Sequence, residues 1–180
     1  MNPPDWQLRV ALESDIPALS ELIPRSARAL LAAHYSTAQI EAALGPVFGV
    51  DRTLVHDGTT WIAASGSMVV ACGSWSRRSS NFGGDAARIE ADAMLNPAND
   101  PARIRAFFVE PAWVRRGLGQ ALLQVCEAEL QAAGFHRATL VATLAGEPLY
   151  ASAGYQVVER YSIALDSGLQ LPAVRMMKSF

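Results

Sequence analysis

The stretch Val109-Glu-Pro-Ala-Trp-Val-Arg-Arg-Gly-Leu-Gly-Gln-Ala-Leu-Leu123 decides the fold of this chain. The apolar segment 104–109 predicts a strand, and after a turn a long helix is predicted to begin at Leu118. Glycine at a helix start lets a ligand approach the backbone closely, and the first helical turn has unpaired N–H groups at the positive end of the helix dipole. Arg115 and Arg116 add charge where a phosphate or pyrophosphate would lie. We therefore interpret this turn as an anion-binding loop.

The bulk composition is that of an ordinary globular protein. The 180 residues predict a single domain, 1–180, with a substantial core, and no internal repeat is visible. A net charge of −2 argues against a general binder of nucleic acid or of anionic membranes. No signal peptide is visible at the first residues, and no apolar stretch approaches the ~20 residues that span a bilayer. We therefore expect a cytoplasmic protein.

Cysteine and histidine usage predicts no metal site. Cys72 and Cys126 fall in segments predicted as a strand and a helix, which favours two reduced, buried thiols over a disulfide. His34, His56 and His136 are too scattered along the chain to suggest a metal centre.

The first hundred residues show a mixture of helix and strand signals. Apolar alternation and cap residues predict a strand at 8–12, a helix after Ser14, a second helix after Ser36 and a hairpin of strands at 59–64 and 68–75. The polar segment 77–100 is long for a connection in a compact domain, so we interpret it as a binding loop or an insertion with a short helix around 86–95.

The second half is more regular. We expect a strand at 103–109, a helix at 118–133 ended by Gly134, a strand at 138–143, a helix at 147–153 and a terminal hairpin of strands at 155–165 and 169–177. Strands and helices in this order predict an α/β domain with a mixed sheet. The terminal hairpin is apolar enough to pair with a second subunit, so a homodimer is plausible.

Two common nucleotide-binding motifs do not fit the glycine loop. A dinucleotide fingerprint requires Gly or Ala three positions after Gly119, where Leu122 stands. A P-loop requires Gly-Lys-Ser/Thr, but Gln120 follows Gly119. A glycine-rich turn that binds nothing remains the alternative, although it does not explain the paired arginines.

At this point the chain resembles the GNAT N-acetyltransferase superfamily. The resemblance rests on Phe107-Phe-Val-Glu-Pro111, Arg115-Arg-Gly-Leu-Gly119 and Glu147-Pro-Leu-Tyr-Ala-Ser-Ala-Gly-Tyr155. It implies a mixed, mostly antiparallel central sheet flanked by helices, a core at about 103–160 that binds acetyl-CoA, and elements on the acceptor side at about 8–100. The residues that it implies for acetyl-CoA are Phe107, Phe108 and Val109 for the pantetheine arm, and Arg115, Arg116, Gly117, Leu118, Gly119 and Gln120 for the pyrophosphate.

Two positions depart from the family pattern. Val114 stands where the family often has Arg or Gln, three positions before the first glycine. Thr143 stands where the family tends to have Asn, seven positions before the tyrosine. Main-chain N–H groups would still hold the phosphate, and the Thr143 hydroxyl would replace part of the hydrogen bonding.

Tyr150 matches the family's tyrosine that commonly protonates the departing CoA thiolate. A thiol has a pKa of ~8.5 and a tyrosine ~10, so this residue can donate a proton at neutral pH. The alternative is a packing residue on a short helix.

The sequence indicates the base that deprotonates the amine less clearly. Glu110 is the candidate at the end of the strand, although it equally suits a solvated turn; the other candidates are Glu90, Asp92 and His34 with Tyr35.

The resemblance implies acetyl transfer to a primary amine by direct attack in a ternary complex, with acetyl-CoA as cosubstrate and no metal. The acceptor is open between small molecules and peptide amines. Arg77, Arg78, the segment 82–85 and Arg105 are candidates for the acceptor pocket. The alternative function is a non-catalytic acyl-CoA-binding or regulatory module.

Overall fold

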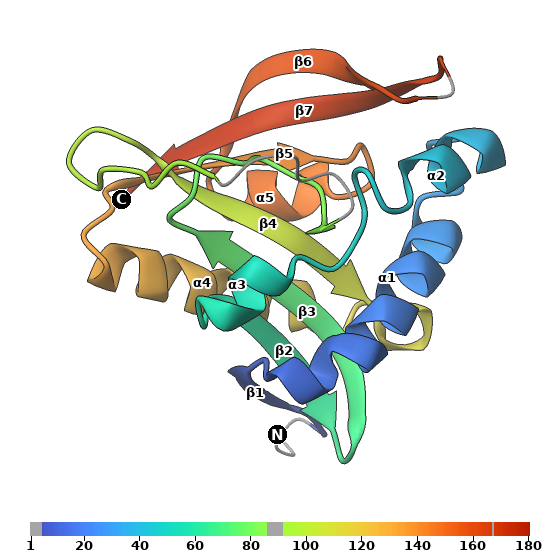
Figure 1. Ribbon diagram of the computed structural model, residues 1–180, viewed down its shortest axis with the longest axis horizontal. Helices are drawn as coiled ribbons and strands as arrows, with labels where there is room; N and C mark the ends of the chain where they lie inside the picture. Colours follow the sequence, from blue (N-terminus) through green and yellow to red (C-terminus); the bar gives the residue numbers. More distant parts are fainter. Residues whose placement is uncertain (1–4, 86–91, 167) are drawn as a thin grey trace.

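The protein is built on one seven-stranded sheet (Figure 1). The computed structural model describes residues 5–85, 92–166 and 168–180. The sheet has the order β1-β2-β3-β4-β5-β7-β6, and its strands are β1 (Gln7–Val10), β2 (Thr60–Ser65), β3 (Met68–Ser76), β4 (Ala102–Val109), β5 (Arg137–Ala142), β6 (Gln156–Ala164) and β7 (Gln170–Ser179). Every neighbouring pair is antiparallel except β4 and β5, which are parallel. The prediction of a mixed, mostly antiparallel sheet with a C-terminal hairpin is confirmed.

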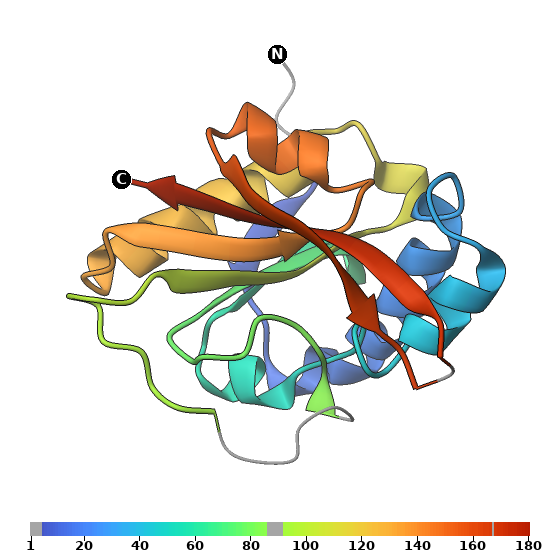
Figure 2. The same cartoon turned by 90° about the horizontal axis from the view of Figure 1, so that it is seen from above.

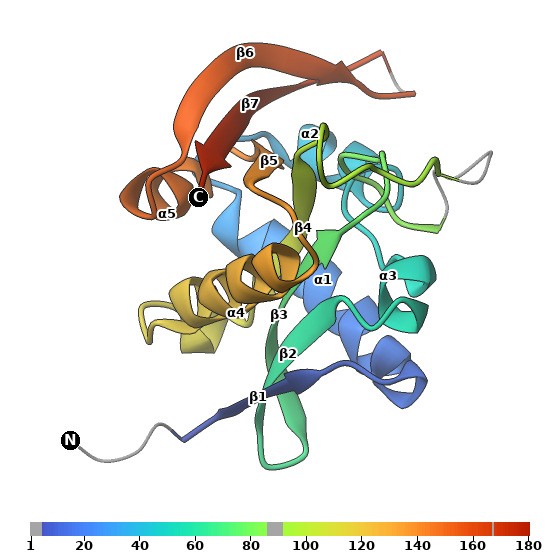
Figure 3. The ribbon, with the colours of Figure 1, turned by 90° about the vertical axis from the view of Figure 1, so that its left-hand side faces the viewer.

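Helices cover both faces of the sheet. They are α1 (Ile16–Leu30), α2 (Thr37–Ala43), α3 (Arg52–His56), α4 (Leu118–Ala132) and α5 (Glu147–Ser152), with 3-10 turns at Glu13–Asp15 and Pro111–Trp113. Figure 3 shows α4 on one face and α1 with α3 on the other. The α4 helix contacts β2, β3 and β4, and α1 packs against β3 and β4. The strand β4 is therefore buried between two helices, where it can support a site on either face.

The helix ends follow from local sequence. The Ser36 hydroxyl accepts a hydrogen bond from the Gln39 N–H at 3.2 Å, and the Gln39 Oε1 accepts one from the Ser36 N–H at 2.9 Å, which forms a capping box. Gly134 ends α4 with φ +90°, and the Phe135 N–H then reaches the Leu130 carbonyl at 3.0 Å. Both ends were predicted from the sequence.

One predicted helix is wrong in its described part. Residues 92–95 are not helical and run beside 77–79: the Leu95 N–H donates to the Arg77 carbonyl at 2.8 Å, and the Ser79 N–H donates to the Ala93 carbonyl at 3.0 Å. Backbone pairing with the segment after β3 therefore overrides the local helical preference. The rest of that predicted helix, 86–91, lies outside the described residues.

The short helix α3 was not predicted. It has only five residues, too few for a helical period to be visible. Its start is specified by Asp51, whose side chain accepts a hydrogen bond from the Thr53 N–H at 3.0 Å.

The sheet splits between its two parallel strands. β4 pairs with β5 only from Ala102 to Ile104, whereas β4 continues to Val109. Ala106 has φ +56°, and the register between β3 and β4 shifts at the same place, which is the geometry of a β-bulge. The bulge turns the end of β4 away from β5 and opens the sheet at this point.

The terminal hairpin crosses over the rest of the sheet (Figure 2). It is held near its turn by α2, where the Gln39 side chain donates to the Gln170 carbonyl at 2.7 Å. The strand β6 is an edge of the sheet, and Val157 and Val158 on it are exposed. Pairing of this edge with a second copy remains a prediction. No helix in the described ranges is long and apolar enough to span a membrane.

Candidate functional site

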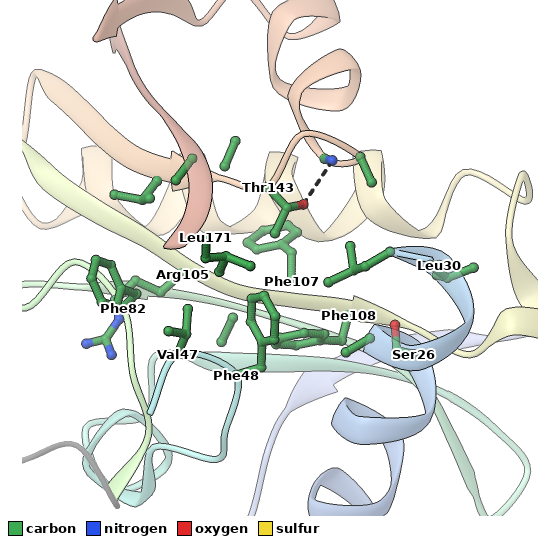
Figure 4. Close-up of a pocket in the computed structure, with 18 of the residues that line it drawn as sticks. Ser26, Leu30, Val47, Phe48, Phe82, Arg105, Phe107, Phe108, Thr143 and Leu171 are labelled. Carbon is green, nitrogen blue, oxygen red and sulfur yellow. Dashed lines mark hydrogen bonds between the residues drawn. The ribbon is translucent and has the colours of Figure 1, made fainter. Parts of the chain in front are cut away.

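A cavity of about 210 Å³ lies at the split between β4 and β5 (Figure 4). Its walls come from both halves of the chain: α1, the segments 47–49 and 81–83, the strand β4, the segment 141–146, α5 and the hairpin strands β6 and β7. The predicted CoA-binding core and the predicted acceptor-side elements therefore meet in one cavity.

The end of β4 presents backbone groups to this cavity. The Glu110 N–H donates to the Val70 carbonyl of β3 at 2.8 Å. Backbone groups alternate sides along a strand, so those of Phe107 and Val109 face the split instead. The Ser26 hydroxyl from α1 accepts a hydrogen bond from the Val109 N–H at 3.2 Å. Amide groups of an extended ligand arm lying in the split would meet the same row of backbone groups.

The Phe107 side chain fills the space left by a glycine on β3. A Cβ added to Gly73 would lie 2.8 Å from the Phe107 ring, closer than real Cβ contacts allow. The ring packs edge-on against Tyr150, with centroids 6.0 Å apart. Gly73 thus allows Phe107 to reach the tyrosine that was predicted as the acid.

The loop before α4 has the backbone of an anion site. Gly117 is the N-cap residue with φ +81°, and Arg115 has φ +63°. No side chain caps the start of α4, so the first N–H groups of the helix face outward. The Arg116 guanidinium lies 4.4 Å from the Trp113 ring and 3.3 Å from the Asp5 carboxylate, and both loop arginines are exposed. This arrangement suits a phosphate group held by main-chain donors with cations beside it.

Gly119 brings the first turn of α4 close to α5. A Cβ at this position would lie 3.1 Å from the Leu149 side chain, and both residues line the cavity. The anion loop therefore lies at one end of the cavity, next to the helix that carries Tyr150.

Thr143 directly follows β5 and organises the turn into α5. Its hydroxyl accepts a hydrogen bond from the Gly146 N–H at 3.1 Å, drawn in Figure 4. Its carbonyl accepts from the N–H groups of Gly146 and Glu147, each at 3.0 Å. Thr143 lines the cavity, and because its oxygen already accepts a bond, its O–H proton can be donated elsewhere.

Tyr150 lies in the cavity wall and is 8% exposed. Burial, together with the nearby Cys126, raises the pKa of its phenol. A phenol with a raised pKa keeps its proton at neutral pH, as a proton donor must. Tyr155, the next aromatic ring, lies 6.0 Å from Tyr150 between centroids, is buried, and does not line the cavity.

The candidate bases that the structure describes do not line the cavity. Glu110 is held by Arg25, with 2.8 Å between Nε and Oε2, and does not line the cavity. His34 is exposed, and Asp92 accepts a hydrogen bond from Ser80. Glu90 lies outside the described residues.

Tyr35, named with His34 among the candidates, has a structural role. Its hydroxyl donates to the Pro172 carbonyl and accepts from the Leu144 N–H, each at 2.8 Å. Burial raises the pKa of this phenol. It therefore ties the segment after α1 to β7 and to the turn that follows β5.

The acceptor-side candidates divide into two groups. Phe82 and Arg105 line the cavity, and the Arg105 guanidinium donates to the Gly83 carbonyl at 2.6 Å. Arg77 lies over Trp75, with 5.2 Å to the ring centroid. Arg78 forms an ion pair with Asp57 at 2.6 Å, so its charge stabilises the loop and is not directed into the cavity.

Asp51 and Ser26 were not identified as site residues from the sequence. Asp51 pairs with Arg105 at 3.1 Å, and both side chains are 2% exposed. No local signal links these two residues, which are far apart in the chain. Ser26 could have been found from the sequence, because it is a polar residue among the apolar residues that form the buried face of α1.

The cysteines are buried thiols, as predicted. Burial raises the pKa of Cys72 to about 12 and also raises that of Cys126. Neither residue lines the main cavity. Within the described ranges, no cluster of three or more His, Cys, Asp or Glu side chains is arranged to hold a metal ion.

Many solved structures share this fold. An N-acetyltransferase related to GCN5 from Rhodopseudomonas palustris has 23% identity and a TM-score of 0.72, covering 97% of this chain and 95% of that one. The PaiA N-acetyltransferase of Thermoplasma acidophilum, solved with coenzyme A, has 15% identity and a TM-score of 0.65 over 97% and 99% of the two chains. YncA, a putative acetyltransferase from Salmonella typhimurium solved with acetyl-CoA, has 16% identity and a TM-score of 0.61 over 98% and 94%. At these identities the likeness establishes the fold.

The family is established by a sequence comparison. No curated protein matches the sequence at a significant level. The model of the acetyltransferase (GNAT) domain matches residues 56–157, more than half of the chain, and this range includes the anion loop and Tyr150. The chain therefore belongs to the GNAT acetyltransferase family.

Proposed function

We propose that this protein is an acetyl-CoA-dependent N-acetyltransferase that acts on a primary amine by direct attack in a ternary complex. The observation that carries the proposal is the cavity at the split of β4 and β5, with the uncapped start of α4 at one end and the Tyr150 side chain in its wall. The two similar structures with coenzyme A or acetyl-CoA bound support the same cosubstrate here.

The residues present fit acetyl-CoA. The main-chain N–H groups of 115–120 suit the pyrophosphate because Gly117 has a backbone conformation that side chains rarely adopt and no side chain caps α4. The backbone groups of Phe107 and Val109 suit the amides of the pantetheine arm. Acetyl-CoA supplies an activated thioester, whose C–S bond breaks as the acceptor nitrogen forms a C–N bond.

The chain's own residues then have separate roles. The Tyr150 phenol gives its proton to the sulfur of the leaving thiolate, and proton transfer of this kind contributes ~10²–10⁴ in rate. Thr143 positions the turn that carries α5 and offers its O–H to the cavity. Glu110, held at the end of β4 by its 2.8 Å contact with Arg25, is the candidate base that takes the amine proton through water. The raised pKa values of Cys72 and Cys126, both outside the cavity wall, favour direct attack over an acyl-cysteine intermediate.

The test compares Tyr150→Phe with Tyr155→Phe. Both changes remove one phenolic oxygen from neighbouring buried rings, but only Tyr150 lines the cavity. We expect Tyr150→Phe to lower amine-dependent thiol release by ~10²-fold or more while calorimetric affinity for CoA stays close to that of the parent protein. Tyr155→Phe should keep most of the turnover. Equal turnover in the two variants would remove Tyr150 from the mechanism, and tight CoA binding without thiol release for any amine would indicate a binding module instead.

A further inference from the structure

The cavity has a distinct wall on the side away from α5. We call it the acceptor wall and define it as Val47, Phe48, Phe82, Phe108 and Leu171. Figure 4 shows Val47 and Phe48 on the opposite side of the cavity from Thr143, with Phe82 beside Arg105 at one end. Because Tyr150 and Thr143 belong to the other side, the space along the acceptor wall is the part left for the amine.

The acceptor wall is apolar and firmly packed. Phe48 is 6% exposed and packs edge-on against Phe108, with ring centroids 6.0 Å apart. It also belongs to a buried cluster that includes Leu171 and the inner face of α1. An apolar body placed against this wall is stabilised by the removal of its surface from water, whereas a charged group there loses its hydration without compensation.

An ion pair lies at one end of the acceptor wall. Arg105 lines the cavity, and its guanidinium is paired with the Asp51 carboxylate, both side chains being 2% exposed. Its hydrogen bond to the Gly83 carbonyl at 2.6 Å and its ion pair with Asp51 at 3.1 Å hold it in place. Because the Asp51 carboxylate is already paired with Arg105 and does not line the cavity, this pair offers no counter-ion to a second ammonium group on the acceptor.

The volume limits the acceptor further. The whole cavity is about 210 Å³, below the roughly 300–1,000 Å³ of pockets that hold drug-sized ligands, and it must also take the reacting end of acetyl-CoA. On the basis of the proposed function, we propose that the acceptor is a compact primary monoamine with an apolar alkyl or aryl body. Its single amine points towards Tyr150, and its body lies along the acceptor wall.

The experiment compares two amines of equal length, n-hexylamine and 1,6-diaminohexane, in thiol release at saturating acetyl-CoA. They differ by one terminal ammonium group. We expect kcat/KM for hexylamine to exceed that for the diamine by at least about tenfold, with 2-phenylethylamine also accepted. Equal or better use of the diamine overturns the inference but leaves the acetyltransferase proposal intact.

A pair of variants locates the selectivity in the acceptor wall. Phe82→Glu places a carboxylate at a partly exposed position of the wall, and Leu12→Glu makes the same kind of change at an exposed position away from the cavity. We expect Phe82→Glu to move the hexylamine-to-diamine ratio towards the diamine by about tenfold or more, whereas Leu12→Glu leaves the ratio unchanged. An unchanged ratio in folded Phe82→Glu contradicts the assignment of the wall.

A binding measurement separates a failure of the proposed function from a failure of this inference. If neither amine releases thiol, the proposed function fails, and calorimetric titration of the CoA-saturated protein with the same two amines decides the inference. Preferential binding of hexylamine supports it. Absence of hexylamine binding, or binding of the diamine at least as tight, overturns it.

Discussion

The packing of Phe107 against Gly73 makes a quantitative prediction about stability. In Gly73→Ala the new Cβ would lie 2.8, 2.9 and 3.0 Å from three atoms of the Phe107 ring, whereas ordinary contact begins at 3.4 Å. The ring must therefore retreat by about 0.6 Å, and its other neighbour is the buried ring of Tyr150. Overpacking of this kind costs about 1–3 kcal/mol, so we expect the free energy of unfolding of Gly73→Ala, measured by urea denaturation, to be lower than that of the parent protein by that amount.

A double-mutant cycle isolates this contact. Phe107→Leu removes the ring atoms that the new methyl group would meet, while the backbone that faces the cavity is kept. We expect Gly73→Ala to cost at least about 1 kcal/mol less in the Phe107→Leu background than in the parent protein. Additive free energies of unfolding, within about 0.5 kcal/mol, would refute the reasoning, because they would mean that the methyl group does not meet the ring.

Three further changes test separate parts of the structure. Ser26→Ala removes the acceptor of the Val109 N–H and should lower the free energy of unfolding by about 1–3 kcal/mol. Ser26→Thr, which keeps a hydroxyl, should cost less. Equal melting temperatures of the parent and both variants would contradict this. Asp15→Asn should destabilise at pH 7, because the hydrogen bond from Arg9 lowers the pKa of Asp15 below its ordinary 3.8. That stabilisation is present above the ordinary pKa and is lost as the pH falls through the lowered value, so the difference between the two proteins in urea denaturation should shrink as the pH falls below 3.8. A difference that stays constant would argue against the ion pair. Cys72, whose pKa burial raises to about 12, should react with a disulfide reagent at pH 8 only after unfolding, and rapid reaction of the native protein would show that the thiol is accessible.

The elements with a strong local signal were predictable. The helix α4 has an apolar face, a glycine start and the Gly134 end, and the terminal hairpin has two β-rich runs around a turn, so each is specified by nearby residues. The loop 115–120 could be proposed as an anion site for the same reason, since its glycines and arginines are contiguous. The boundaries of these predicted elements agree with the structure to within about two residues.

The features that depend on distant contacts were not predictable. The segment 92–95 takes its backbone partners from 77–79, and no local pattern indicates that pairing. The ion pair of Arg105 with Asp51 joins β4 to the start of α3. Glu110 was chosen from its place at a strand end, but its contact with Arg25 depends on where α1 packs. Sequence reasoning thus proposes residues for the cosubstrate side, and the three-dimensional structure is needed to propose residues for the acceptor side.

The central claim is that main-chain amides at 115–120 hold the diphosphate of coenzyme A, and calorimetric titration tests it most directly. The parent protein, Gly117→Ala and Gly66→Ala are each titrated with coenzyme A and with pantetheine, which lacks the diphosphate. Gly66 is the matched control because it also has a positive φ and open space around it, but lies in the β2–β3 turn. We predict that Gly117→Ala lowers the affinity for coenzyme A towards that for pantetheine, whereas Gly66→Ala binds as the parent does. Coenzyme A binding that is equally tight in Gly117→Ala and the parent, or no tighter than pantetheine binding in the parent, would contradict the claim.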